Sequence, residues 1–243
     1  YLRRAYMDLK NKTVVIIGGT SGIGLATAIA ANKRGAIVHA ASRSKDKVEA
    51  KASEYPDINF FQQDIHDSLG LEKSFQALGE IDHVVAVATG ANRKNAPFME
   101  QSPEEFKEAF NKFWGYTNVA RLSLPLIRQE GSLTFVSGFP ARKCNVGMSS
   151  ISATGCAVEG LSRALALEVA PIRVNVVAPG IIDTEAFDRL GEGKSTALEN
   201  MGKNIPIGRV GRPEEVGLAI IHAMENPYMT GATIDIDGGI LLP

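Results

Sequence analysis

The sequence predicts an α/β protein with one doubly wound parallel sheet, and two observations support this fold class. Short apolar runs that suit buried strands alternate along the chain with segments of helical periodicity. Parallel strands need a crossover between them, and continuous Val and Ile runs indicate that helices cover both faces of the sheet. Seven strands are expected, at residues 13–17, 37–41, 59–62, 83–87, 132–136, 173–177 and 233–236.

Helix signals occupy several of the segments between these strands. Ser102 and Pro103 precede a long apolar segment, and the pattern predicts one helix over residues 106–127. Further helices are expected over residues 149–169 and 216–224. Alternation of strand and helix therefore continues to the end of the chain.

Residues 184–204 follow the sixth predicted strand and hold three glycines among mixed charges. A long segment at a strand end can be a lid over a site. It can equally be an ordinary surface insertion, and both interpretations stay open.

Length and composition are those of an ordinary globular protein. The chain has 243 residues, of which 44% are apolar and 22% charged, so a sizeable core is expected and disorder is excluded. Lys and Arg number 26 against 27 Asp and Glu, so the chain lacks the positive charge with which proteins bind nucleic acids or anionic membranes. Residues 9–243 are expected to form one domain, and residues 1–8 an N-terminal extension or a cloning remnant.

Cysteine usage and the first apolar segment bear on compartment. Cys144 and Cys156 are too few for a disulfide framework and show no zinc-type spacing with histidine, so no metal site is expected and a reducing cytoplasm fits best. Residues 13–32 carry no charge, but the glycines, Thr and Ser among them indicate a strand, a turn and a buried helix in place of a membrane span.

A glycine-rich turn follows the first predicted strand. Gly18, Gly22 and Gly24 lead into the helix after it, with Thr20 and Ser21 between them. Small residues let the backbone approach a diphosphate, and the N–H groups and positive dipole end of the helix favour that anion. A glycine cluster by itself also suits a tight turn, so its place between strand and helix carries the interpretation.

On these residues the chain resembles the short-chain dehydrogenase/reductase family, and the resemblance covers residues 9–239. Gly18, Gly22 and Gly24 match the glycines of the family's T-G-x-x-x-G-x-G motif, with Ile17 in place of its Thr. The resemblance implies a Rossmann-type fold with a nicotinamide dinucleotide as cofactor and a small molecule as substrate.

Three further segments carry the resemblance. Asp64, after the third strand, matches the family residue that contacts the adenine. Residues 179–184 match P-G-x-x-x-T, whose backbone and Thr hold the nicotinamide carboxamide, and residues 237–239 match the C-terminal D-G-G. The resemblance assigns these residues to the cofactor site: Gly18, Thr20, Ser21, Gly22, Ile23, Gly24, Ser42, Arg43, Asp64, Ile65, Ala88, Thr89, Gly90, Pro179, Gly180, Ile182 and Thr184.

The residues after the second strand bear on the choice of dinucleotide. An acidic residue there bonds the ribose 2′-hydroxyl of NAD and repels the extra phosphate of NADP. Ser42 stands at that position, and Arg43 can pair with a 2′-phosphate. NADP(H) is therefore favoured over NAD(H), although the ordinary interpretation of such an arginine is a solvated loop cation.

The family's catalytic residues are the part that matches least. In the family a Tyr, aided by a Ser and by a Lys four residues after the Tyr, protonates the oxygen that hydride transfer creates. The resemblance puts Ile151 at the Tyr position, Gly155 at the Lys position and Gly138 at the Ser position, with Ser137 one residue early. Asn111 is the one counterpart of the family's catalytic tetrad.

Loops after the fourth and fifth strands carry polar groups that could replace the acid. Lys143 is the first substitute to test, and Ser137 and Ser152 follow it. Arg93, Lys94 and Arg142 would favour an anionic substrate if they face the site. The ordinary interpretation of these three cations is again a solvated loop.

Two functions of different classes stay open. An oxidoreductase would use NADP(H) to transfer hydride to or from a small carbonyl or imine, and an imine that arrives protonated needs no acid. A sensor or inactive subunit would keep the cofactor motifs equally well, and a cleft reused for non-redox chemistry is a third interpretation. Resemblance favours the oxidoreductase. The helices over residues 106–127 and 149–169 resemble the family's subunit contacts, so a homodimer or homotetramer is expected.

Overall fold

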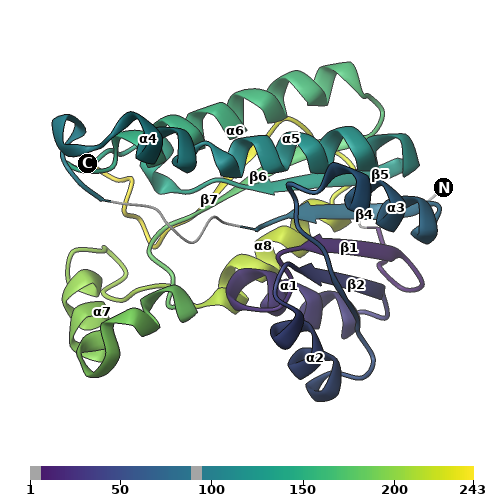
Figure 1. The fold of residues 1–243 in the computed structure, drawn as a ribbon, viewed down its shortest axis with the longest axis horizontal. Helices are drawn as coiled ribbons and strands as arrows, with labels where there is room; N and C mark the ends of the chain where they lie inside the picture. Colours follow the sequence, from purple (N-terminus) through teal and green to yellow (C-terminus); the bar gives the residue numbers. More distant parts are fainter. Residues whose placement is uncertain (1–6, 89–94) are drawn as a thin grey trace.

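The computed structural model describes residues 7–88 and 95–243, and a seven-stranded parallel sheet forms its centre (Figure 1). All seven predicted strands are present, which confirms the doubly wound fold. The strands are β1 Thr13–Ile17, β2 Ile37–Ser42, β3 Asn59–Gln62, β4 Ile81–Ala86, β5 Ile127–Val136, β6 Arg173–Pro179 and β7 Thr233–Ile236.

The order of the strands determines where a ligand can enter. They lie side by side in the order β3-β2-β1-β4-β5-β6-β7, so β1 pairs with β2 on one side and with β4 on the other. The connections that follow β1 and β4 therefore lead outward in opposite directions, and the switch point lies between these two strands. Doubly wound sheets bind ligands beyond the carboxyl ends of their strands at such a switch point.

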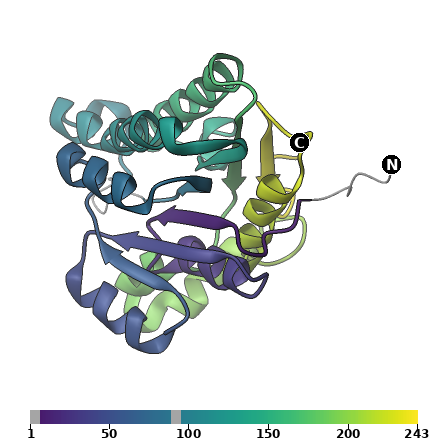
Figure 2. The ribbon, with the colours of Figure 1, turned by 90° about the vertical axis from the view of Figure 1, so that its right-hand side faces the viewer.

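Helices cover both faces of the sheet (Figures 1 and 2). The α-helices of the described residues are α1 Gly22–Asn32, α2 Lys45–Glu54, α3 Ser68–Leu78, α4 Pro103–Ala109, α5 Asn111–Ser123, α6 Ser149–Glu168, α7 Lys194–Gly202 and α8 Pro213–Glu225. Short 3₁₀ turns are η1 Phe98–Glu100, η2 Leu124–Leu126, η3 Phe139–Ala141 and η4 Glu185–Gly193.

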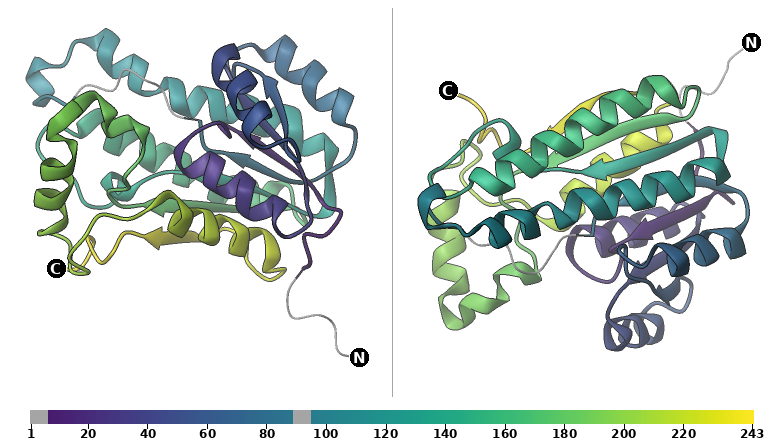
Figure 3. Two further views of the ribbon diagram at one scale, coloured as in Figure 1. Left: turned by 90° about the horizontal axis from the view of Figure 1, so that it is seen from below. Right: turned by 45° about the horizontal axis from the view of Figure 1, so that its top comes forward.

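Alternate strand residues supply two separate cores. In β1, Val14 and Ile16 belong to the core beneath α1 and α8, whereas Val15 and Ile17 belong to the core beneath α3, α5 and α6. Figure 3 shows α1 beside α8 in one view and α5 beside α6 in the other. Because successive strand side chains point to opposite faces, a run of Val and Ile fills both cores at once.

The single helix predicted over residues 106–127 is wrong. α4 ends at Ala109 and α5 begins at Asn111, with Phe110 between them. The N–H of Phe110 donates to the carbonyl of Lys107, three residues back, so the helical ladder tightens there before it resumes. Apolar periodicity continues through this joint, and for that reason the sequence pattern did not reveal it.

The end of the same segment also differs from the prediction. β5 begins at Ile127 and not at residue 132, because Ile127 pairs with Ile81 ahead of a register shift between β4 and β5. Three exposed polar residues, 128–130, follow Ile127 and hide the start of the strand from an apolar pattern.

Residues 184–204 fold into regular secondary structure. The 3₁₀ turn η4 leads into α7, and Figure 1 shows both in green beside the carboxyl ends of the strands. This placement agrees with a lid over that edge of the sheet. The lid and the surface insertion both stay predictions for residues 184–204.

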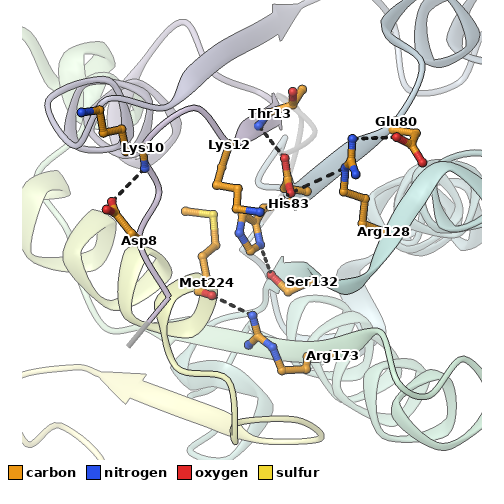
Figure 4. A network of polar contacts seen from close by, with 11 residues as sticks. Asp8, Lys10, Lys12, Thr13, Glu80, His83, Arg128, Ser132, Arg173 and Met224 are labelled. Carbon is orange, nitrogen blue, oxygen red and sulfur yellow. Dashed lines mark hydrogen bonds and ion pairs between the residues drawn. The ribbon is translucent and has the colours of Figure 1, made fainter. Parts of the chain in front are cut away.

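A polar network closes the opposite, amino end of the sheet (Figure 4). The Asp82 carboxylate accepts the Thr13 N–H and the Lys12 ammonium, both at 2.9 Å. The guanidinium of Arg173 donates to the carbonyls of Ala223 and Met224 at 2.6 and 2.7 Å, and so binds the carboxyl end of α8. Strands and helix are thus joined at this end by charge-assisted hydrogen bonds.

His83 lies fully buried within this network. Its Nδ1 is 2.8 Å from the Ser132 hydroxyl oxygen. Burial, with the nearby charge of Arg173, lowers the pKa of His83 to about 3, while Asp82 raises it and Lys12 lowers it by smaller amounts. The imidazole is therefore neutral in the folded protein at neutral pH.

This neutral histidine should make the protein sensitive to acid. Above pH 6.5 neither state protonates His83, whereas below pH 6.5 the unfolded chain binds a proton that the folded chain refuses, so stability falls by up to about 1.4 kcal/mol per pH unit. His83→Asn should lose stability less steeply than the unaltered protein in urea unfolding between pH 7 and pH 5. His66→Asn, at an exposed histidine, is the control. Equal slopes for the unaltered protein and His83→Asn would refute the effect.

Candidate functional site

Two loops approach closely where the carboxyl ends of β1 and β4 meet. Gly18 has a φ of +102°, and a Cβ on it would lie 2.6 Å from the backbone N of Ala88. The N–H groups of Val87 and Ala88 both donate to the Ile17 carbonyl. A larger residue at position 18 would push the loops apart, so the glycine brings two backbones into contact at the switch point.

The amino end of α1 presents backbone and little side chain. A Cβ on Gly24 would lie 2.0 Å from the Gly18 carbonyl oxygen, so only glycine fits there. Ser21, the N-cap residue, makes no side-chain cap bond, and the first turn holds no acidic residue. The first N–H groups of a helix have no partner within the helix, so this turn can bind an anion.

The loop after β6 lies against the same turn. A Cβ on Gly22 would lie 3.1 Å from Cγ2 of Thr184. Upstream in this loop, Gly180 packs against Asp237, whose carboxylate accepts two backbone N–H groups, including that of Gly239. The fold therefore brings together three segments that the sequence predicts for one site.

The second and third strands end beside this site. Ser42 ends β2, and the exposed Arg43 follows it. No hydrogen bond or ion pair of the Arg43 guanidinium occurs within the part of the chain that the structure describes. Asp64 accepts the His66 N–H at 2.9 Å, and Asn118 donates to the Ile65 carbonyl at 3.0 Å. Side chains thus fix the loop after β3 and leave the arginine available.

The structure also describes four other residues that are predicted for the cofactor site. Thr20 is buried, Ile23 is half-buried on α1, Pro179 ends β6, and the buried Ile182 pairs with the segment at Gly211. Thr89, Gly90, Arg93 and Lys94 lie outside the described residues.

Ser137 follows β5 and joins two elements. Its hydroxyl donates to the Glu159 carboxylate on α6 at 2.9 Å, and Arg142 lies 3.0 Å from the same oxygen. Arg142 also bonds Asp235 of β7, yet the pKa of Asp235 is raised, first by burial and then by the nearby charge of Asp237. The hydroxyl is engaged with a carboxylate and is held in place by it.

The other two predicted substitutes for the acid also have partners. Lys143 donates to the carbonyls of Ile240 and Leu242 in the C-terminal tail, at 2.6 and 3.2 Å. The Ser152 hydroxyl lies 3.0 Å from the Cys144 sulfur. Their catalytic roles stay predictions.

The amino end of α5 differs most from the expectation. The Asn111 side chain is exposed, and the next residue, Lys112, is the buried one. The Lys112 ammonium donates to the Ser137 carbonyl at 3.2 Å. The sequence reasoning missed this lysine, because the helix break that precedes it leaves no signal in the apolar periodicity.

The first two turns of α6 carry no proton-donating side chain at the two positions compared with the family. Ile151 carries a hydrocarbon side chain, and a Cβ on Gly155 would already lie 3.0 Å from the Cβ of Ala141. Backbone of the η3 turn therefore packs where a longer side chain from position 155 would project.

A cavity of about 710 Å³ opens beside α7. Its charged lining is largely paired: Lys194 lies 2.9 Å from Asp183 and 2.8 Å from Asp188, and hydrogen bonds to these carboxylates raise the pKa of Lys194. The cavity is lined by Asp183, Gly191, Glu192, Lys194, Ser195, Leu198, Glu199, Lys203, Gly208, Arg209 and Val210. The cavity provides space for a small molecule near the carboxyl ends of the strands, where the predicted cofactor residues lie.

The glycine turn from Gly18 to Gly24 fits the diphosphate of a dinucleotide, because the first N–H groups of α1 have no side-chain cap and no acidic residue stands in the first turn. No cluster of three or more possible metal ligands forms within residues 7–88 and 95–243. None of the helices in these ranges is long and apolar enough to cross a bilayer.

Comparison with known families shows the family to which the chain belongs. A family model described as "Enoyl-(Acyl carrier protein) reductase" matches residues 18–241. The chain belongs to the short-chain dehydrogenase/reductase family. A 3-oxoacyl-[acyl-carrier-protein] reductase of Rattus norvegicus is 33% identical to this family member over 96% of the chain and 99% of the relative.

Solved structures agree with this short-chain dehydrogenase/reductase fold. An NADPH-bound short-chain oxidoreductase of Pseudomonas aeruginosa PAO1, described as containing an atypical catalytic center, has a TM-score of 0.88 at 28% identity and covers 96% of this chain and 98% of its own. MalC, a reductase/Diels-Alderase of Malbranchea aurantiaca, has a TM-score of 0.87 at 30% identity, with 97% and 98% covered.

Gly24→Ala tests the glycine turn of this short-chain dehydrogenase/reductase. The added Cβ would overlap the Gly18 carbonyl, so we expect NADPH binding at least tenfold weaker by fluorescence titration and a thermal midpoint several degrees lower. Gly160→Ala on α6 is the matched control, because its Cβ would meet no atom closer than 4.0 Å. Unchanged NADPH affinity in Gly24→Ala would contradict the assignment of the glycine turn.

Proposed function

We propose that the protein is an NADP(H)-dependent oxidoreductase that transfers hydride to or from a small carbonyl- or imine-type substrate, without the Tyr–Lys pair of its family. The observation that carries this proposal is the bare amino end of α1 with Arg43 at the end of β2. The NADPH bound to the Pseudomonas aeruginosa structure supports the cofactor.

Each part of the site has a stated task in this proposal. The dinucleotide supplies hydride when bound. The backbone of Gly18 and Gly24 binds its diphosphate, Arg43 pairs with the 2′-phosphate, and residues 179–184 orient the nicotinamide. The substrate lies on the α7 side, next to the cavity there.

The missing acid limits the chemistry. A general acid contributes about 10² to 10⁴ in rate, so a site without one would reduce a protonated imine more readily than a ketone. Ile151 and Gly155 cannot supply a proton, and no tyrosine occurs between residues 131 and 180. The Pseudomonas aeruginosa relative, with its atypical catalytic center, supports departures of this kind within the fold.

The same missing groups favour a second candidate, a cofactor-binding protein without redox turnover. A third, non-redox use of the site gains support from MalC, which is described as both a reductase and a Diels-Alderase. We propose a homodimer or homotetramer that forms through α5 and α6, since Trp114 on α5 is 56% exposed and makes an edge-to-face contact with Phe113. Both cysteines are free thiols, which suits the reducing cytoplasm we propose.

Titration with NADPH and with NADH tests the cofactor assignment. The unaltered protein should bind NADPH in the micromolar range and NADH more weakly. Arg43→Ala should weaken NADPH binding about ten- to a hundredfold and change NADH binding little, because a charge-assisted hydrogen bond to phosphate is lost.

Lys45→Ala is the matched control, because Lys45 lies 3.6 Å from Glu49 and is not assigned to the site. Failure of both dinucleotides to bind would overturn the oxidoreductase and the sensor together. Binding of NADPH with no oxidation by any carbonyl or imine would favour the protein without turnover.

A further inference from the structure

Glu185 places a carboxylate against the amino end of α1. It is the first residue of η4, in the loop that follows β6. A Cβ built on Gly22 would lie 3.4 Å from Oε2 of Glu185 and 3.1 Å from Cγ2 of Thr184, so both side chains lie against the turn where α1 begins. This carboxylate therefore stands beside the N–H groups that have no partner within the helix.

Two positive features attract the carboxylate to this place. The amino end of α1 is the positive end of the helix dipole, and its first turn holds no acidic residue of its own. Lys51 on α2 is the second feature. Its pKa is raised mainly by the hydrogen bond to Glu54, and the charge of Glu185 adds to the rise. Glu185 thus supplies, from a distant part of the chain, the negative charge that the first turn of α1 lacks.

The backbone just before Glu185 is fixed to a neighbouring segment. The Asp183 N–H donates to the Gly211 carbonyl, and the Gly211 N–H donates to the Ile181 carbonyl, both at 2.9 Å. Glu185 follows this anchor by two residues, and it is exposed. The backbone therefore keeps the residue close to α1, while rotation of the side chain can move the carboxylate toward or away from the helix.

The amino end of α1 is also the place assigned to the diphosphate of the dinucleotide. A diphosphate group carries two negative charges, and a carboxylate a few ångströms away repels them. The carboxylate and the diphosphate are stabilised by the same N–H groups and the same dipole. When the diphosphate binds, the carboxylate has to turn away from the helix and loses that stabilisation.

We propose that Glu185 is an internal competitor of the dinucleotide, whose carboxylate and the cofactor diphosphate bind alternately at the amino end of α1. This inference rests on the proposed function, because it concerns the same cofactor site. Glu185 lowers the affinity for the dinucleotide, since part of the binding free energy is spent on displacing the carboxylate. When the carboxylate returns to α1, it favours release of the dinucleotide.

Removal of this charge should strengthen cofactor binding. Glu185→Gln keeps the shape of the side chain, and it should bind NADPH about three- to tenfold more tightly than the unaltered protein in fluorescence titration at low ionic strength. In about 0.5 M NaCl the gain should fall below about twofold, because salt screens exposed charges. Glu104→Gln is the matched control, since Glu104 is also an exposed acidic residue in the first turn of a helix, and it should leave the affinity unchanged.

Fragments of the cofactor locate the effect at the diphosphate. 2′-Phospho-ADP-ribose keeps the diphosphate and lacks the nicotinamide, whereas adenosine 2′-monophosphate lacks the diphosphate. In competition with NADPH, Glu185→Gln should bind the first fragment about three- to tenfold more tightly and the second with unchanged affinity. A general change in the structure of the site would alter the affinity for both fragments alike.

The outcomes separate this inference from the proposed function. If neither the unaltered protein nor Glu185→Gln binds NADPH, the proposed cofactor site fails and the competitor role falls with it. If the unaltered protein binds NADPH, but Glu185→Gln gains no affinity, keeps its gain in high salt or gains equally for both fragments, only the competitor role is overturned.

A second variant separates the charge of Glu185 from its bulk. Glu185→Ala removes both, and it should gain the same affinity for NADPH as Glu185→Gln does. A gain in Glu185→Ala alone would show that the bulk of the side chain limits binding, and would overturn competition by charge. Thermal midpoints show whether each variant is folded, and Glu185→Ala replaces Glu185→Gln in the salt and fragment measurements if the latter is unfolded.

Discussion

Close contact between backbones at the switch point is the constraint on which the rest of this structure depends. Gly18 lies against Ala88, and Gly24 lies against the Gly18 carbonyl, at distances that leave no room for a Cβ. Because of these contacts β1, β4 and the amino end of α1 meet without intervening side chains. The exposed N–H groups of α1 therefore face the edge where the strand order reverses, and an anion can be bound there by backbone alone.

The two ends of the sheet have opposite chemistry. At the amino end, charged side chains have partners within the fold. Asp82 accepts a hydrogen bond from Lys12, and Arg173 donates to the last carbonyls of α8. At the carboxyl end, the Arg43 guanidinium is exposed and forms no hydrogen bond or ion pair within the described residues. One sheet thus combines a stabilising edge with a binding edge, which is the arrangement that doubly wound folds favour.

Family membership and the residues at the site lead to different expectations about the chemistry of this protein. The family model and the fold establish a short-chain dehydrogenase/reductase. The first two turns of α6, with Ile151 and Gly155, offer neither a phenol nor an amine. Lys112 of α5 is buried and donates to the Ser137 carbonyl just after β5. Function has to be argued from such groups, because a fold can be kept while its chemistry changes.

The sequence by itself determined the seven strands, the parallel sheet, the glycine turn and the motifs after β3, β6 and β7. These are local signals: apolar runs, glycine spacing and their order along the chain. Only the tertiary structure decided that the helix breaks at Phe110, that Asn111 is exposed while Lys112 is buried, and that Lys143 bonds the C-terminal tail. Each of these depends on contacts between residues far apart in sequence, or on the local hydrogen bonding where one helix ends and the next begins. Periodicity shows that a helix has an apolar face, but the surrounding packing decides which polar neighbour is buried with it.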